Sequence, residues 1–408
     1  LFLLFWMKFS LISLCTALSI HAAWSLSNNN SVADFHHTNS LPDKLTIGYA
    51  SWSECDDKIT TAVEQGVNVV IWFAINLLSD ENGAPMITGG PDLTCVAEKK
   101  AEYAARGLAT THLISIGGWN APHPSTDNTA AVVYSNWVQW NDHLFDGFDW
   151  DVEGNDDMSS PSNHITQACL DLMGEMSQLA KSDGYFVTMA PAESYIDPTT
   201  SEFDLSLQHN YPEWEELQPD FHYHGHNTYA YLLQYYGTAT SKLTEEELPT
   251  FDFISIQLYE SYSHAVYNVS ELDMSPVAYL ESFVQKVLSG WEVDYGLIPT
   301  PPGHQLSQSG KGRITIPASQ LIIGLANGWA DGTKALRVWP EEAAAAYSAL
   351  GALSPSLQPR GFMFWDIADE GMVPRGASRE MWMARGLNQF LHTRTEKDVR
   401  ATEEVVSV

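Results

Sequence analysis

Short apolar segments recur along the chain from residue 45 onward, and each predicts a buried β-strand because it is rich in β-branched and aromatic residues. Their apolar positions are nearly continuous, which is typical of parallel strands covered on both faces. The eight expected strands are Leu45–Tyr49, Val67–Ile75, His112–Ile116, Gly147–Val152, Phe186–Ala190, Phe253–Leu258, Leu321–Leu325 and Gly361–Trp365.

Segments of helical character separate these strands: Lys58–Gln65, Ala97–Arg106, Thr129–His143, Ser162–Lys181, Pro276–Leu288, Glu341–Leu350 and Arg379–Leu391. Some have a typical first turn, such as Ser275 followed by Pro276. The alternation predicts an α/β fold, a single (β/α)8 TIM barrel. The interval from Pro191 to Thr250 is too long for a simple loop, so we expect a long insertion after the fifth strand, at the C-terminal mouth of the barrel.

The N-terminal residues predict an export signal. Met7 and Lys8 precede an apolar run that ends at Ile20, and small residues follow at Ala22 and Ala23. We expect a signal peptide within residues 1–24, with an upstream extension of the gene model before Met7. An uncleaved membrane anchor over Leu1–Ala23 is the alternative, and the charge of Lys8 inside that span disfavours it.

The rest of the chain is expected to form one folded unit with flanking segments. Residues 25–43 are rich in Ser and Asn and predict a flexible lead-in, residues 44–391 hold the barrel, and residues 392–408 form a polar tail.

Asp and Glu number 51 against 20 Lys and Arg, a net charge of −31. This balance excludes the basic footprint of a nucleic-acid or membrane-surface protein. A secreted, extracellular monomer is expected.

The cysteines and a histidine cluster bear on cross-links and metals. Cys55 and Cys95 can form a disulfide in an exported chain, although free thiols stay an open alternative, and Cys169 on a helical segment predicts a buried free thiol.

His222, His224 and His226, with His209 upstream, have spacings that zinc or copper could use. No Cys or carboxylate is clearly paired with them, so no metal and no cofactor are predicted.

The fourth strand carries the residues with the clearest chemistry. Asp149, Asp151 and Glu153 alternate with Phe148, Trp150 and Val152. Because side chains alternate between the faces of a strand, the acids project together into the barrel and the apolar residues face the helices. Burying three carboxyl groups is costly unless their charges are shared or neutralised, and this cost points to function.

The segment Asp146-Gly147-Phe148-Asp149-Trp150-Asp151-Val152-Glu153 resembles the signature of glycoside hydrolase family 18, the chitinase family. Other segments resemble the family at the ends of further strands: Ser115–Gly118, Met189–Pro191, Gln257–Tyr259 and Gly361–Trp365. The resemblance extends from about Lys44 to Leu391. Within the signature, Asp146 and Gly147 are expected to have a structural role.

The resemblance implies a substrate-assisted hydrolysis that retains the anomeric configuration. The 2-acetamido oxygen of the substrate attacks the anomeric carbon while Glu153 acts as general acid and then as general base. Asp151 orients the acetamide, Asp149 shares a proton with Asp151, and Tyr259 donates its hydroxyl to the acetamide carbonyl. The implied substrate-binding residues are Trp365, Gln257, Met189, Tyr49, Phe73, Gly118 and Trp119.

The implied substrate is chitin or its oligosaccharides. Only a loop and one helix fit into residues 326–360, which leaves no room for the α+β domain that walls the cleft in many family members, so endo-type cleavage is expected. Glu260 departs from the Asn that many members have after the matching tyrosine. Two alternatives stay open: a non-catalytic chitin- or glycan-binding barrel, and an endo-β-N-acetylglucosaminidase acting on N-glycans.

Overall fold

The computed structural model describes residues 40–52, 55–157, 159–207, 226–260, 263–296, 298–305 and 310–392. The expected signal peptide and most of the lead-in lie outside these ranges, as do His209, His222 and His224. Within the described part of the chain, no helix is long and apolar enough to cross a membrane. Among the same residues, no group of His, Cys, Asp and Glu side chains is arranged to hold a metal ion.

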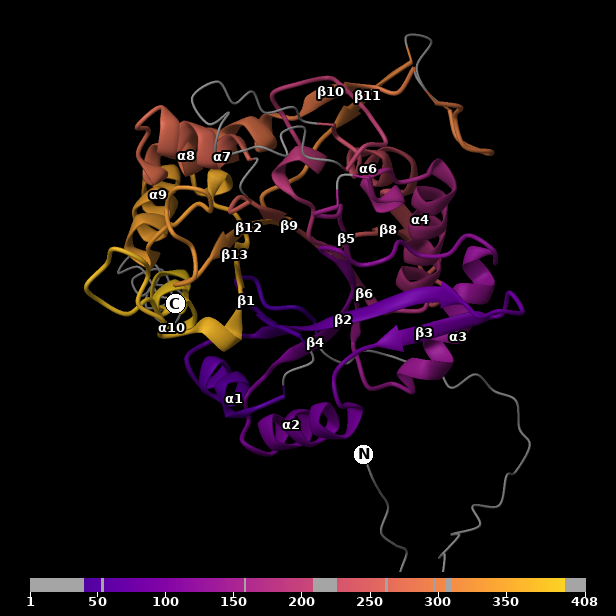
Figure 1. The fold of residues 1–408 in the computed structure, drawn as a ribbon, viewed down its shortest axis with the longest axis horizontal. Helices are drawn as coiled ribbons and strands as arrows, with labels where there is room; N and C mark the ends of the chain where they lie inside the picture. Colours follow the sequence, from indigo (N-terminus) through magenta and orange to yellow (C-terminus); the bar gives the residue numbers. More distant parts are fainter. Residues whose placement is uncertain are drawn as a thin grey trace, which may run out of the picture. The chain divides into compact units, whose positions relative to one another are not determined.

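Eight parallel strands form a closed ring, as the sequence predicts (Figure 1). In order around the ring they are β1 (Leu45–Ala50), β2 (Val69–Ser79), β4 (Thr111–Gly118), β5 (Gly147–Val152), β6 (Phe186–Met189), β9 (Phe253–Gln257), β12 (Leu321–Ala326) and β13 (Gly361–Trp365). Pairing of β1 with both β2 and β13 closes the barrel. A further strand, β3 (Pro85–Gly89), pairs antiparallel with the end of β2 and lies outside the ring.

The seven predicted helices are present as α1 (Asp57–Glu64), α2 (Leu93–Ala105), α3 (Ala130–Asn141), α4 (Gln167–Ser182), α8 (Pro276–Ser289), α9 (Pro340–Leu353) and α10 (Met383–Leu391). The expected start of α4 at Ser162 is wrong. Residues Pro161–Asn163 form a separate 3-10 turn, and Thr166 caps α4 by accepting the backbone N–H of Cys169.

The two faces of β5 are divided as the alternation predicts. Trp150 donates its indole N–H to Ser177 of α4 at 2.8 Å, and Phe148 packs against Trp137 of α3 with ring centroids 5.1 Å apart. These contacts fix the apolar face of the strand against the helices. Asp149 and Asp151 therefore face the barrel interior.

Asp146 and Gly147 lie at the start of β5, where this strand meets its neighbours. Asp146 accepts the backbone N–H of His112 at 2.7 Å and the Lys100 ammonium at 3.0 Å, which joins the start of β5 to its neighbours. A Cβ at Gly147 would lie 1.9 Å from the carbonyl oxygen of Phe186 on β6. Glycine is therefore required where these two strands approach each other.

The expected insertion after the fifth strand, β6, is present. It contains α6 (Ala230–Tyr236) and the antiparallel pair β7 (Thr238–Thr240) and β8 (Glu247–Pro249). A second antiparallel pair that the sequence did not indicate, β10 (Trp291–Asp294) and β11 (Lys311–Ile314), lies between β9 and β12. The two regions are in contact, because the indole N–H of Trp291 donates to the side-chain oxygen of Asn227 at 3.1 Å.

Cys55 and Cys95 form a disulfide, which settles the alternative left open by the sequence, and Cys169 is a buried free thiol. The disulfide ties the segment after β1 to the first turn of α2 across a sequence separation of 40 residues. Cys55 lies three residues after Trp52, so the cross-link is close in sequence to this side chain.

We expect the double variant Cys55→Ser/Cys95→Ser to lose about 2–4 kcal/mol of unfolding free energy, because the cross-link restricts the unfolded chain. Urea denaturation of the oxidised wild type, the reduced wild type and the variant measures this loss. The reduced wild type should match the variant. Equal unfolding free energies in all three samples would show that the cross-link does not stabilise the fold.

Candidate active site

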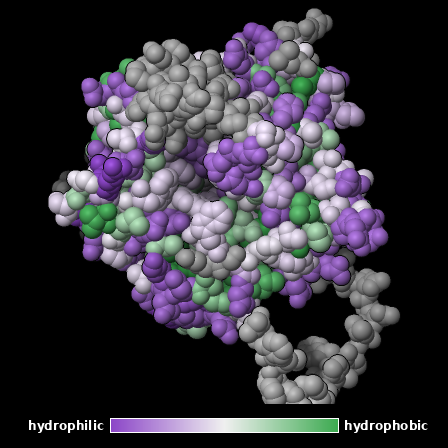
Figure 2. Space-filling model, in the orientation of Figure 1, coloured by the Kyte–Doolittle hydropathy of each residue, from purple (hydrophilic) through white to green (hydrophobic). Residues whose placement is uncertain are grey.

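A cavity of about 470 Å³ opens at the C-terminal ends of the barrel strands. It is lined by Trp52, Phe73, Trp119, Asp151, Glu153, Asp156, Gln257, Tyr259, Glu260, Trp329, Ala335 and Trp365. In the space-filling view of Figure 2 the described surface is hollowed near the centre of the barrel. Aromatic rings and carboxyl groups dominate this lining.

The aromatic part of the lining is built around Trp365 at the end of β13. Its ring lies 4.8 Å from that of Phe73 and 6.1 Å from that of Trp52, both nearly perpendicular to it. Trp329 donates its indole N–H to the Trp365 carbonyl at 2.8 Å and meets Tyr259 edge to face at 5.9 Å. Trp52 is 67% exposed, so it forms the rim of the cavity. Such rings offer flat apolar faces on which a sugar ring can stack.

Asp149 lies deepest in the acidic row and is fully buried. It accepts the hydroxyls of Tyr49 at 2.6 Å and Thr188 at 2.5 Å. Burial raises the pKa of Asp149 to about 7, although the two hydroxyls oppose the rise. The implied sharing of a proton with Asp151 is not seen in these hydrogen bonds, and Asp149 acts on Asp151 through its charge.

Gln257, at the end of β9, holds the next two acids. Its side-chain nitrogen lies 2.9 Å from Asp151 Oδ1 and 3.2 Å from Glu153 Oε1. The same nitrogen lies 2.7 Å from the carbonyl oxygen of Ala190. Because an amide donates two hydrogens, the three acceptors share them, and the carboxyl groups are oriented toward one point.

The protonation of these acids is shifted by their surroundings. Burial, followed by the charge of Glu153, raises the pKa of Asp151 well above its usual range. Burial raises the pKa of Glu153, and hydrogen bonds from Asp151, Gln257 and Glu260 oppose that rise. The cluster therefore retains protons at a pH where isolated carboxyl groups are ionised.

Glu260 adds a fourth carboxyl group to the row. Its side chain is hydrogen-bonded to Glu153, and burial and then the charge of Glu153 raise its pKa well above the usual range. The departure from Asn noted in the sequence thus lies directly against the expected catalytic acid. Two carboxyl groups in hydrogen-bonding contact favour one shared proton, because both cannot be ionised at low cost.

Asp156 fixes the opposite wall. Its two carboxylate oxygens accept the Trp119 indole N–H at 2.9 Å and the Asn120 amide at 2.7 Å. Asn120 adopts a left-handed backbone with φ 64°, and its side-chain oxygen accepts the N–H of Asp156 at 2.8 Å. Trp119 is therefore held in place at the edge of the cavity.

Three residues expected to bind substrate do not line the cavity. Met189 is fully buried on the outward side of β6, since the preceding Thr188 faces inward. Tyr49 lies below the cavity and donates to Asp149. A Cβ on Gly118, where φ is 110°, would lie 2.1 Å from the Phe73 ring, so Gly118 makes room for Phe73.

The sequence did not indicate four lining residues: Trp52, Asp156, Trp329 and Ala335. Each follows the C-terminal end of a barrel strand, where barrel enzymes place their sites. That position was the available signal, but the loops themselves show no periodicity that separates a lining residue from a neighbouring one.

No protein-family model matches the sequence, and comparison with curated proteins gives no match. Solved structures do match. The C-terminal domain of ChiA from Legionella pneumophila has a TM-score of 0.50 at 15% identity, over 79% of this chain and 93% of that domain. A fungal endo-β-N-acetylglucosaminidase of glycosyl hydrolase family 18 has a TM-score of 0.47 at 15% identity, over 87% of this chain and 100% of that one.

This chain shares its (β/α)8 barrel fold with the ChiA domain. A xylanase and α-amylase inhibitor protein from Scadoxus multiflorus is also similar, with a TM-score of 0.42 and 15% identity over 79% of this chain and 93% of that one. The barrel fold alone does not fix an activity, which must be inferred from the site.

The raised pKa of Asp149 predicts a pH-dependent stability. In the unfolded chain this carboxyl ionises near 3.8, whereas in the folded chain it ionises at about 7. Its contribution to stability is therefore fully present below pH ~4 and is lost as the pH rises toward ~7. We expect Asp149→Asn to reduce this loss between pH 5 and 8.

Urea unfolding at pH 5 and at pH 8 measures the change in unfolding free energy of the wild type and of Asp149→Asn, with the exposed Glu246→Gln as the control. Glu193 and Glu370, whose pKa values burial also raises to about 7, remain in the variant, so the slope should shrink without vanishing. An unchanged slope in Asp149→Asn would contradict the assignment.

Proposed function

We propose that this chain is a chitinase, a glycoside hydrolase that cleaves β-1,4 linkages between N-acetylglucosamine units with retention of configuration. The supporting observation is the row Asp149, Asp151 and Glu153, which is buried and ends in a cavity with aromatic walls. A purely structural barrel has no need for such a row, because buried carboxyl groups destabilise the fold unless function requires them.

The first step uses the substrate's own acetamide. A sugar stacks on Trp365, its acetamide N–H donates to Asp151, and the Tyr259 hydroxyl donates to the acetamide carbonyl. The acetamido oxygen forms a bond to the anomeric carbon as the glycosidic bond breaks, and Glu153 gives its proton to the leaving oxygen. The positive charge on the cyclic intermediate lies next to Asp151, which stabilises it.

In the second step water replaces the acetamido oxygen. Glu153, now a carboxylate, accepts a proton from the water as the water oxygen bonds to the anomeric carbon. The acetamide is restored, and two displacements leave the configuration retained. The proton taken from the water restores Glu153 to its acid form for the next cycle, and the hydrogen bonds of Asp151 and Glu260 to Glu153 hold its carboxyl group in place.

Two further features support the finer assignment. The connection from β12 to β13 contains α9 and a short 3-10 turn, Pro355–Leu357, so it adds no walling domain and favours an open groove with endo-type cleavage. The Cys55–Cys95 disulfide is typical of an oxidising compartment and supports an extracellular location. On this basis we propose that the protein is secreted and that its substrate is chitin.

The variant Glu153→Gln tests the proposal. It keeps the size and shape of the side chain but cannot donate or accept the catalytic proton, so we expect activity on a fluorogenic chitotrioside and on colloidal chitin to fall by about 10³-fold or more relative to the wild type. Glu98→Gln on the exposed face of α2 is the matched control and should retain full activity.

Other results would redirect the assignment. Binding to chitin with no hydrolysis by the wild type would indicate a non-catalytic carbohydrate-binding barrel. Release of N-glycans from a glycoprotein, with no action on chitin, would indicate an endo-β-N-acetylglucosaminidase.

A further inference from the structure

The strand that bears Glu153 extends beyond its neighbour. The register of β5 with β6 ends at Trp150 and Met189, and the N–H of Ala190 donates to the Trp150 carbonyl at 2.8 Å. In a regular parallel ladder the N–H of Val152 would come next and would donate to the carbonyl of Ala190. Val152 directly precedes Glu153, so its backbone determines where the acid points.

The carbonyl of Ala190 and the N–H of Val152, which would pair in a regular ladder, have other partners. The carbonyl of Ala190 accepts the Gln257 side-chain amide at 2.7 Å, the same amide that holds Asp151 and Glu153. The chain then turns at Pro191, whose carbonyl accepts the N–H of Gln257 at 2.9 Å. The N–H and C=O of Val152 are therefore left facing the side where β6 has ended, and both are buried.

A side chain from the insertion satisfies both groups. The Tyr229 hydroxyl accepts the N–H of Val152 at 2.7 Å and donates to the Val152 carbonyl at 3.0 Å. Tyr229 is fully buried, so water cannot take over either bond. One phenolic oxygen thus continues the ladder at the point where the strand leaves the sheet.

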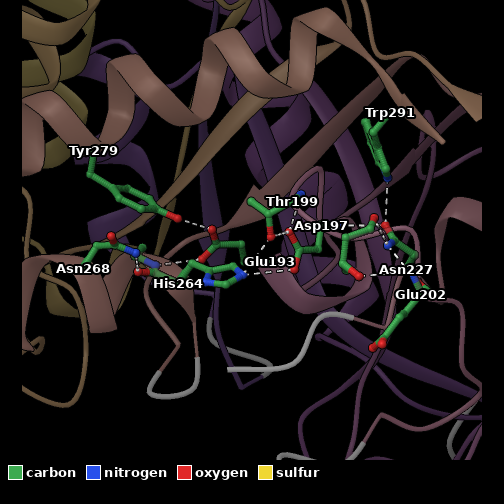
Figure 3. Close-up of polar contacts among 11 residues, drawn as sticks. Glu193, Asp197, Thr199, Glu202, Asn227, His264, Asn268, Tyr279 and Trp291 are labelled. Carbon is green, nitrogen blue, oxygen red and sulfur yellow. Dashed lines mark hydrogen bonds and ion pairs between the residues drawn. The ribbon is translucent and has the colours of Figure 1, made fainter. Parts of the chain in front are cut away.

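Tyr229 is itself held firmly. Its ring stacks on that of Tyr195 at 5.7 Å, and its backbone N–H donates to the Tyr195 carbonyl at 3.0 Å. Two residues earlier, Asn227 accepts from the N–H of Asp197 at 3.0 Å and donates to the carbonyls of Thr200 and Glu202 (Figure 3). The close-up shows this network continuing through Asp197 to His264, which lies 3.1 Å from Asp197 Oδ2.

We propose that Tyr229 is a positioning residue of the hydrolase, through which the insertion fixes the backbone at Val152 and so aims Glu153 at the substrate. This inference rests on the proposed function. It gives the insertion a role in the chemistry in addition to any contact with substrate. His123 supports the same segment from the opposite side, with its Nε2 3.1 Å from the Glu153 carbonyl.

Tyr229→Phe removes only the hydroxyl. We expect kcat on the chitotrioside to fall about 10–100-fold, because a small displacement of a catalytic group carries a penalty of this size. KM should stay within about 2-fold, because the cavity lining is unchanged. The matched control is Tyr231→Phe on α6, another fully buried tyrosine, whose hydroxyl donates to Asp171 at 2.6 Å away from β5. It should keep the wild-type kcat even where its unfolding temperature falls by a similar amount.

Two readouts do not depend on activity. Hydrogen exchange of the Val152 amide should accelerate about 10-fold or more in Tyr229→Phe and not in Tyr231→Phe, since a buried N–H loses its partner only in the former. The NMR titration midpoint of the Glu153 carboxyl, assigned with Glu153→Gln, should shift in Tyr229→Phe alone.

The two proposals can fail separately. An inactive wild type overturns the hydrolase, while exchange and titration still decide whether Tyr229 positions Glu153. A Tyr229→Phe variant with the wild-type Glu153 titration, or with losses equal to those of Tyr231→Phe, overturns the positioning role and leaves a merely structural tyrosine.

Discussion

The side-chain amide of Gln257 connects three parts of the barrel that are distant in sequence. Its nitrogen lies within 3.2 Å of oxygens of Asp151, Glu153 and Ala190. By taking the Ala190 carbonyl it interrupts the regular ladder, and by holding the two carboxyl groups it sets their orientation. The geometry of the site and the irregular end of β5 therefore have the same cause. Only a group with two donor hydrogens and no charge could bridge the carboxyl groups without forming an ion pair with them.

In β5 the packing of the apolar face stabilises the fold, whereas burial of the acids on the other face destabilises it. The outward face of β5, with Phe148 and Trp150 packed on α3 and α4, fixes the strand and forces the acids inward. Inside the barrel, burial raises the pKa of each acid, and hydroxyl and amide donors offset part of the cost. A local rule is broken at this site and compensated nearby, which is typical of a functional site in a stable scaffold.

The sequence predicted what depends on local patterns. The bounds of β5 match because the alternation of aromatic and acidic residues is unambiguous over Gly147–Val152. The start of α4 was missed because Ser162 and Thr166 are both plausible caps, and only the packed structure distinguishes them. Met189 was expected to bind substrate because it lies in a segment that resembles the family, whereas the inward-facing Thr188 before it places Met189 on the outward face of β6.

Contacts across long sequence distances were beyond prediction. Tyr229 reaches Val152 across 77 residues, from an insertion with no regular pattern. Trp329 and Trp52 come from loops that periodicity does not describe. Tyr229 is positioned by the polar network within the insertion, whereas Trp329 and Trp52 contact Trp365 at the mouth of the barrel, and a single sequence encodes neither arrangement in a local motif.

The central claim is that the buried acids serve a substrate-assisted reaction. Proton NMR of the first products released from chitotetraose tests this most directly, because the anomeric signals report the configuration before mutarotation. The account predicts that the β anomer appears first and the α anomer grows in later. First appearance of the α anomer would mean direct attack by water and would contradict the role given to Asp151 and the acetamide.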